Sequence, residues 1–315
     1  MAGIIDYAGL FPPSALEMDE AIRNYARYRG EADREMLSHF ICPATRLHEL
    51  DKYSDELFSV NPPFTFSVLS KGSDSPKTFL DAVSEDLDLL KKFYKTHGNR
   101  GRVEALEIKT PVAETAEETA EMLNIAARLI NARMPNDVAV FYEPSLKGDW
   151  KSAVDTLAEA IKLHNEVMAN GVRYLRGGLK LRCGGITKDL FPDDEQVARV
   201  IHLCLKNSIP YKATAGLHHP VRFQNDEIGV LMHGFLNVFG AGIFGKVFGL
   251  SEAQILEIIQ DKDPANFEFT DSYFSWKRYK ATDETIREAR ESLATSFGSC
   301  SFDEPREDLK THKFI

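Results

Sequence analysis

Four charged side chains occur inside segments of the 315-residue sequence that are otherwise apolar. The lysines are Lys180 in GGLKLRCGG and Lys212 in IPYKATAGL; the glutamates are Glu107 in VEALEIKTP and Glu143 in VAVFYEPS. Buried lysines and carboxylates are rare unless they are paired, because an isolated ion loses its hydration when it leaves water. Each residue alone fits a structural ion pair, but the set favours a catalytic site.

A lysine among apolar side chains and beside another cation has a particular use. Its ammonium form is disfavoured there, and the neutral amine can attack a carbonyl carbon to form a Schiff base. Lys180 and Lys212 on neighbouring strands would disfavour each other's charge in this way. Glu107 or Glu143 would then shuttle the proton or hold the second lysine charged. We expect these four residues to be the catalytic group.

Two more cations follow members of this group at a spacing of two residues. Lys109 follows Glu107, and Arg182 follows Lys180. Side chains two positions apart in a strand point to the same side, so we expect both cations to face the catalytic group and bind substrate. The guanidinium of Arg182 can hold a carboxylate or a phosphate through two parallel hydrogen bonds.

Asp6 and Gly216 are further candidates for substrate binding. Asp6 opens the stretch DYAGLFPPSAL, whose glycine and proline pair predict a shaped loop after the first strand. Gly216 ends the segment that carries Lys212, at a point where a larger side chain would block access. For Arg222, farther along, we expect a salt bridge to a strand-end carboxylate instead of a substrate contact.

A histidine doublet, His218 and His219, follows the second lysine segment. Adjacent residues in an extended segment point to opposite sides, so we expect at most one ring to face a given site. Pro220 holds the residue before it extended. We expect the doublet to bind substrate without a cofactor. The alternative is a divalent metal held by His218, His219 and Glu143, although no H-x-H or H-E-x-x-H spacing is present.

The four cysteines, Cys42, Cys183, Cys204 and Cys300, are far apart and form no C-x-x-C pair. This pattern fits reduced thiols in the cytoplasm better than a disulfide scaffold or a zinc ribbon. A cysteine nucleophile needs a base and a lowered pKa. The stretch SFGSCSFDEP around Cys300 supplies neither, so we expect a solvent-exposed loop there.

The elements that must position these residues follow the pattern of repeated β-α units. Short apolar runs alternate with segments of helical period, such as 75–98 and 115–134. This alternation predicts a (β/α)8 TIM barrel, in which chemistry takes place at the C-terminal ends of the strands. A doubly wound parallel sheet is the alternative, but no G-x-G-x-x-G follows the first strand. Seven strands are expected at 3–9, 36–44, 64–72, 103–111, 138–145, 177–185 and 209–217.

The eighth strand has two candidates, 234–242 and 267–276. The first could equally belong to an apolar helix, whereas the second shows better alternation. We predict a single barrel domain over 1–315, in which 282–315 forms a C-terminal helix and tail. The apolar stretch GFLNVFGAGIFGKVFGL is either a core segment or a subunit interface, which leaves a homo-oligomer open.

Charge and composition exclude several classes of partner. Acidic residues outnumber basic ones by 48 to 38, for a formal charge of −10, so nucleic acid is a poor partner. The chain does not begin with a basic segment followed by a long apolar one, and no apolar run reaches membrane-spanning length. We therefore expect a cytoplasmic protein that acts on a small molecule.

GGLKLRCGG, a helical segment and then PYKATAGL resemble the sixth and seventh strands of class I aldolases of the deoxyribose-phosphate aldolase type. The resemblance implies a barrel fold, with Lys180 as the Schiff-base lysine and Lys212 as the neighbouring cation that activates it. It covers 177–217 only. The family's strand-4 aspartate is replaced by Glu107 in LEIKTP, and the sequence after Gly216 departs from the family's pattern.

Three functions are consistent with these residues. The leading one is an aldolase-type lyase that acts on a small oxygenated, anionic substrate through a Schiff base. The second is a metal-dependent hydrolase, isomerase or lyase that uses His218 or His219 with strand-end carboxylates. The third is a barrel that binds a small ligand without catalysis.

Overall fold

The computed structural model describes residues 1–169 and 176–315. Eight parallel strands form a closed barrel in the order β1-β13-β7-β6-β5-β4-β3-β2, which confirms the predicted TIM barrel over the doubly wound sheet. The barrel strands are β1 Ile5–Tyr7, β2 Leu37–Pro43, β3 Phe64–Leu69, β4 Gly101–Lys109, β5 Ala139–Glu143, β6 Gly177–Arg182, β7 Tyr211–Thr214 and β13 Ala294–Ser299. All seven strands expected from the sequence are present.

The helices and the remaining strands lie between the barrel strands in the sequence, except for the last helix, which follows β13. The α-helices are α1 Met18–Tyr28, α2 Ser54–Leu57, α3 Pro76–His97, α4 Ala116–Arg133, α5 Trp150–Met168, α6 Asp194–Lys206, α7 Phe235–Phe248, α8 Glu252–Gln260, α9 Asp283–Ser292 and α10 Asp303–Thr311. The short antiparallel strands are β8 Phe223–Asn225, β9 Val230–Met232, β10 Phe267–Phe269, β11 Tyr273–Trp276 and β12 Tyr279–Thr282.

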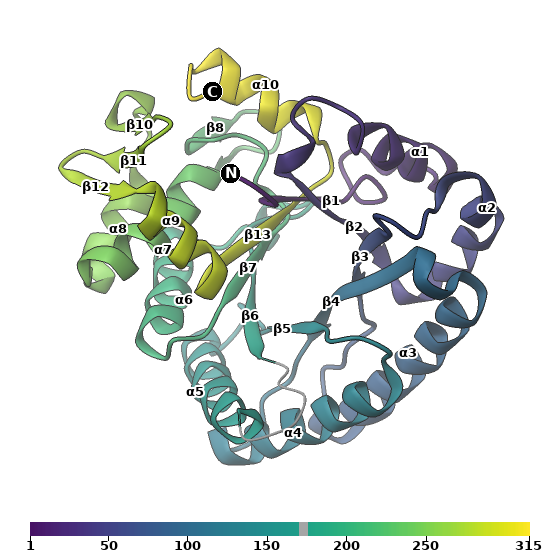
Figure 1. The fold of residues 1–315 in the computed structure, drawn as a ribbon. Coiled ribbons are helices and arrows are strands. Elements are labelled where there is room, and N and C mark those ends of the chain that lie inside the picture. The colour runs from purple at the N-terminus through teal and green to yellow at the C-terminus, as the bar shows by residue number, and fades with distance from the viewer. Residues whose placement is uncertain (170–175) are drawn as a thin grey trace. The chain divides into compact units, whose positions relative to one another are not determined.

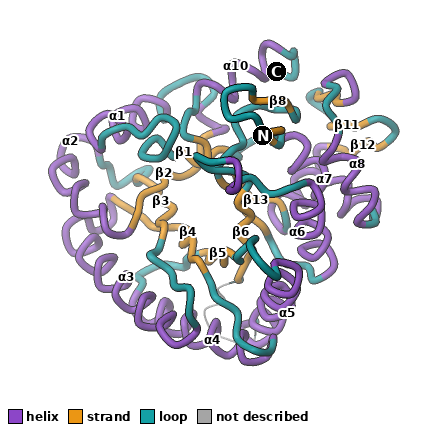
Figure 2. The backbone as a smooth tube through the Cα atoms, turned by 180° about the vertical axis from the view of Figure 1, so that it is seen from behind, coloured by secondary structure: helices purple, strands orange, loops and turns teal. Residues whose placement is uncertain are grey.

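The chain divides into two compact units, 1–180 and 181–315. In the first unit, α3, α4 and α5 lie outside β3, β4 and β5 (Figure 1). Seen from behind, α1 and α2 lie outside β2 and β3 (Figure 2). The strands from β1 to β6 pair in parallel with their sequence neighbours, and their registers place Leu69 opposite Glu107 and Lys109 opposite Glu143.

Two of the long helices of the first unit, α3 and α4, begin where the sequence predicts. Ser75 caps α3 by accepting a hydrogen bond from the backbone N–H of Lys77, and a proline occupies the first turn. Thr115 caps α4 by accepting from the N–H of Glu118. Each helix buries one apolar face, so the expected helices at 75–98 and 115–134 are confirmed.

In the second unit, β7 pairs in parallel with β13, and α7 packs against α6, α8, α9 and β13. Residues 235–245 of α7 are all buried, so the apolar stretch 234–250 contributes to the core of this unit. The strand candidate at 234–242 is wrong. A segment that is apolar on every side can be buried as a helix, and Gly249, with φ of 65°, ends this helix in the left-handed conformation.

The other candidate for the eighth strand, 267–276, is also wrong. It forms β10 and β11, which make a small antiparallel sheet with β12. The eighth barrel strand is β13, inside the segment 282–315 that was expected to be a helix and a tail. Its sequence ATSFGS consists mostly of small side chains, so it carries little of the apolar signal by which strands are recognised.

Within the described ranges, none of the helices combines the length and the apolar character needed to cross a lipid bilayer.

Candidate active site

A buried ammonium group lies between two carboxylates in the first unit. Lys180 Nζ is 3.0 Å from Glu107 Oε2 and 2.8 Å from Glu143 Oε2. The three side chains are 3%, 2% and 12% exposed, respectively. Ser67 Oγ donates a hydrogen bond of 2.7 Å to the other oxygen of Glu107. The catalytic lysine and both glutamates expected from the sequence are therefore brought together.

Four adjacent strands hold this lysine cluster, which consists of Ser67, Glu107, Glu143 and Lys180. Ser67 comes from β3, and the charged members come from β4, β5 and β6. Glu143 is the last residue of β5, while Glu107 and Lys180 are each third from the end of their strands. The cluster thus occupies the C-terminal halves of the strands, where chemistry takes place in barrels of this kind.

Because the lysine cluster is buried, its charges are stabilised mainly by one another and not by water. Removing an ion from water is costly, and the ion pairs with Glu107 and Glu143 compensate Lys180 for that loss. Both carboxylate oxygens also lie within proton-transfer distance of Nζ. The arrangement can therefore hold the ammonium in place and take a proton from it.

The cations expected beside this cluster have other surroundings. Lys109 is the last residue of β4, its side chain is 50% exposed, and it forms an ion pair with Asp74. Lys109 is still paired with Glu143 in the sheet, but its side chain is turned to the exposed Asp74. The two-residue spacing from Glu107 therefore does not bring the ammonium group of Lys109 into the lysine cluster. Arg182 is the last residue of β6 and is partly exposed.

Asp6 belongs to a second polar group of the first unit. Its Oδ1 accepts a hydrogen bond of 2.9 Å from the backbone N–H of His39 and lies 2.7 Å from Nδ1 of the same residue. The other ring nitrogen of His39 is 3.2 Å from Glu104 Oε2, and this hydrogen bond lowers the pKa of Glu104. His39 and Glu104 lie in the N-terminal halves of their strands, so these contacts direct Asp6 away from the strand ends where substrate was expected.

In the second unit, Lys212 is completely buried on β7. Thr214, two residues later, is also buried, and its hydroxyl oxygen has no hydrogen-bond partner within the described part of the chain. Gly216 follows with φ of 70°, and a Cβ there would lie 2.8 Å from the carbonyl oxygen of Cys183. A glycine is thus required at 216 by the backbone conformation and by close packing. The sequence suggests only that a larger side chain would block access to the site.

Both rings of the histidine doublet contact carboxylates of α10. His218 Nδ1 is 3.1 Å from Glu304 Oε2, and His219 Nδ1 forms a close pair with Asp308. The expectation that the rings point to opposite sides is wrong. Ala215 and Gly216 both have positive φ, so the chain bends after β7, and the two histidines follow this bend outside any strand, where the alternation of an extended strand does not apply.

His218 also lies beside Cys300, with 3.7 Å between Nδ1 and Sγ. Burial disfavours the charged ring, but the hydrogen bonds with Cys300 and Glu304 outweigh this effect and raise the pKa of His218 to about 9. In turn, the hydrogen bond from His218 lowers the pKa of Glu304. The exposed loop expected around Cys300 is wrong, because Cys300 is buried directly after β13 and has an imidazole base next to it.

A metal site was the alternative use of the doublet, with Glu143 as a further ligand. The doublet pairs instead with Glu304 and Asp308 of its own unit. In residues 1–169 and 176–315, no group of three or more histidine, cysteine, aspartate or glutamate side chains has an arrangement that would hold a metal ion.

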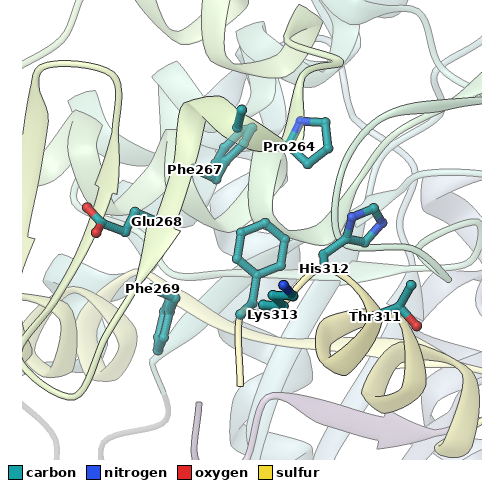
Figure 3. A pocket seen from close by; sticks show the side chains of 9 residues that line it. Pro264, Phe267, Glu268, Phe269, Thr311, His312 and Lys313 are labelled. Atoms are coloured by element: carbon teal, nitrogen blue, oxygen red, sulfur yellow. The ribbon is translucent and has the colours of Figure 1, made fainter.

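Two other features of the second unit lie outside the predicted site. Arg222 forms a salt bridge of 2.7 Å with Asp194, which confirms the expected salt bridge, although the carboxylate is at the first residue of helix α6 and not at a strand end. A pocket of about 410 Å³ lies between β10 and the C-terminal end of α10 (Figure 3). Phe267, His312 and Lys313 contribute to its lining, which includes none of the predicted site residues.

Sequence reasoning missed several partners in these groups. Ser67 was detectable in principle, since it is a polar residue inside the apolar run FTFSVL. Glu304 and Asp308 gave no such signal, because acidic residues in a short amphipathic helix are ordinary on an exposed surface.

Comparison with known proteins gives little further information. No family model matches the chain, and no curated protein matches its sequence. A solved structure described as the GH6 Orpinomyces sp. Y102 enzyme aligns with 66% of this chain and 68% of its own, at 12% sequence identity and a TM-score of 0.34. At this level of likeness the match carries no argument about activity, and the barrel assignment rests on the strand pairing of this chain itself.

Proposed function

We propose that this protein is an enzyme, a lyase of aldolase type, that forms a Schiff base between Lys180 and the carbonyl carbon of a small oxygenated, anionic substrate. The observation that carries the proposal is the buried contact of Lys180 Nζ with both Glu107 and Glu143. A lysine on the surface would be hydrated and would not contact two buried carboxylates. The resemblance of 177–217 to class I aldolases supports the same lysine.

The carboxylates give the lysine a route to its reactive form. When a substrate carbonyl enters, one carboxylate takes a proton from Nζ, and the neutral amine attacks the carbonyl carbon. The oxygen then receives two protons, the one returned by this acid and a second that the nitrogen loses to the same carboxylate after the addition, so it leaves as water and the iminium ion forms. Glu143, at 2.8 Å and with the more exposed side chain, is the better placed of the two to exchange this proton with substrate. Glu107, fixed by Ser67, keeps the lysine oriented.

The iminium ion supplies the chemistry of the lyase step. It withdraws electrons from the bond between the carbons α and β to the iminium carbon. As a carboxylate takes the proton of the hydroxyl on the β carbon, this bond breaks, the β-carbon fragment leaves as a carbonyl compound, and the electron pair is held as an enamine. The charge of the substrate would be met by cations near the strand ends, for which Arg182 and Lys109 are the proposed contacts. Lys212, buried on β7, is proposed to contribute positive potential.

Borohydride reduction tests the proposal directly. The protein is incubated with a panel of aldehydes and 2-ketoacids, reduced, digested and mapped by mass spectrometry. We expect a stable adduct on Lys180 with any carbonyl compound that is turned over. Lys162, which is partly exposed on α5, is an internal control and should stay unmodified under the same conditions. Turnover of a substrate without an adduct on Lys180 would overturn the proposal.

A further inference from the structure

Cys300 differs from the other three cysteines in what lies next to its sulfur. The thiols of Cys42 and Cys183 donate to the backbone carbonyls of Pro43 and Leu181 at 3.5 Å and 3.9 Å. Cys300 Sγ instead lies 3.7 Å from an imidazole nitrogen, Nδ1 of His218. An imidazolium next to a thiol favours the thiolate whereas a carbonyl does not, so Cys300 has a neighbouring group that can activate it.

Burial separates the same cysteines further. Cys42, Cys183 and Cys204 have no exposed surface, and burial raises the pKa of each of these thiols. Cys300 is 6% exposed. It is therefore the cysteine with both a base and some contact with solvent.

Glu304 completes the arrangement by stabilising the ring after it has taken a proton. Its Oε2 lies 3.1 Å from the same nitrogen, Nδ1, that faces the sulfur. A proton on Nδ1 would thus lie between a thiolate and a carboxylate, both of which favour the imidazolium. This combination of a thiol, a base and an acidic orienting group is the one that activates a cysteine nucleophile.

The backbone fixes all three groups. Gly298 of β13 pairs with Thr214 of β7, which sets Cys300 and His218 just beyond the ends of two paired strands. Ser301 Oγ accepts a hydrogen bond of 3.1 Å from the backbone N–H of Glu304 and so holds the first turn of α10. The geometry is thus set by the strand pair and the helix start, with no long flexible segment involved.

We propose that Cys300 and His218 form a nucleophilic thiol site that adds to small carbonyl electrophiles. The imidazolium of His218, with its proton on Nδ1, pairs with the thiolate of Cys300, and the sulfur attacks the carbonyl carbon. A carbon–sulfur bond forms as the carbonyl π bond opens, and the oxygen takes that electron pair and then the proton from Nδ1. The product is a hemithioacetal, which contains every atom of the thiol and of the carbonyl compound. This site is independent of the Schiff base on Lys180.

Alkylation of the intact protein with iodoacetamide at neutral pH tests the activation of the thiol, with the other cysteines as internal controls. We expect Cys300 to react first, and roughly tenfold faster than an ordinary exposed thiol, a few per cent of which is ionised at this pH. His218→Asn should remove most of this advantage, and Glu304→Gln should reduce it. His312→Asn, near the end of the same helix α10, is the matched control and should leave the rate unchanged.

Two results would overturn the activation. One is a Cys300 rate no higher than those of Cys42, Cys183 and Cys204 in the native protein. The other is an unchanged rate in both His218→Asn and Glu304→Gln, each confirmed as folded by circular dichroism. Two variants are used because Glu304 is 41% exposed and its replacement leaves the fold least disturbed.

Carbon NMR of isotope-labelled acetaldehyde tests the addition itself. We expect a hemithioacetal resonance with the wild-type protein that disappears in Cys300→Ser. A borohydride-trapped adduct on Lys180 would persist in Cys300→Ser, so failure of one site is distinguishable from failure of the other. Rapid alkylation of Cys300 without any hemithioacetal signal would overturn the carbonyl specificity.

Discussion

The lysine cluster of the first unit and the thiol site of the second unit (His218, Cys300 and Glu304) use opposite means to prepare a nucleophile. The lysine is enclosed within regular strands, and two carboxylates hold its charge. The thiol follows a strand end, and its histidine and glutamate come from a bent loop and a helix start. The first depends on burial and ion pairing between regular strands, whereas the second depends on residues that lie beyond the strand ends.

The two sites should therefore be sensitive to different kinds of change. In a buried ion pair, a large desolvation cost is offset by a large electrostatic attraction, so the loss of one partner leaves the other charge uncompensated and lowers stability strongly. A histidine and a partly exposed glutamate form a pair that responds to pH. We expect the lysine cluster to be affected most by the loss of a charge, and the thiol site by pH and by changes at the bend after β7.

Lys180→Met should lower the free energy of unfolding by about 3–5 kcal/mol, because two buried carboxylates lose the cation that both contact. The matched control is Lys109→Met, which removes a half-exposed ion pair with Asp74 and should cost about 0–1 kcal/mol. Urea unfolding monitored by circular dichroism measures both. Equal losses in the two variants would contradict the assignment of Lys180 to a buried ion-pair cluster.

Raising the pH should destabilise the second unit through His218. Its pKa is raised from 6.5 to about 9 in the folded protein, so the imidazolium contributes stability below about pH 6.5 that is lost as the pH rises through about 9. The full loss amounts to about 3 kcal/mol. Urea titrations across this window should show the decline in the wild type and a flatter curve in His218→Asn. An identical slope in the two proteins would exclude His218 as its source.

Gly216→Ala should cost about 1–3 kcal/mol, because it adds a side chain at φ of 70° and brings its Cβ within 2.8 Å of a carbonyl oxygen. Gly148→Ala is the control, since Gly148 has φ of 65° but a Cβ added there would meet no atom within 4 Å. Gly148→Ala should lower the free energy of unfolding only by the smaller cost of placing alanine at a positive φ. Thermal unfolding separates the two, and a Gly148→Ala loss as large as that of Gly216→Ala would show that the bend does not depend on close packing.

Asp308→Asn should have the smallest effect, less than about 1 kcal/mol, because its partner His219 is 32% exposed and water replaces the contact. The alkylation rate of Cys300 should not change, since the base is His218 and not its neighbour. A slower rate in Asp308→Asn would extend the thiol site to the second histidine. The same chemical denaturation and alkylation assays provide both measurements.

Regular periodicity explains how much of the molecule could be predicted from the sequence. Seven strands carry apolar runs, and the pairing of Glu107 and Lys180 follows from charges placed inside such runs. Lys109 shows where the rule ends, because a long side chain at the end of a strand can reach an exposed partner, here Asp74, although its backbone is still paired in the sheet.

The remaining features depend on tertiary contacts that leave little trace in local sequence. β13 is a strand because β7 supplies its hydrogen-bonding partner, although ATSFGS has few apolar side chains. Cys300 meets His218, which lies in a different segment of the chain and follows the bend at Gly216. A spacing rule cannot describe a pair of this kind.

The parallel pairing of β7 with β13 has a consequence for folding kinetics. Thr214 and Gly298 meet only after α7, α8, the β10–β12 sheet and α9 have been accommodated between them. Closing so long a loop loses chain entropy before native contacts form, which favours a late event on the folding pathway. Cys300 meets His218 only when β13 has paired with β7. The reactivity of the Cys300 thiol during refolding should therefore show when this last barrel strand has paired.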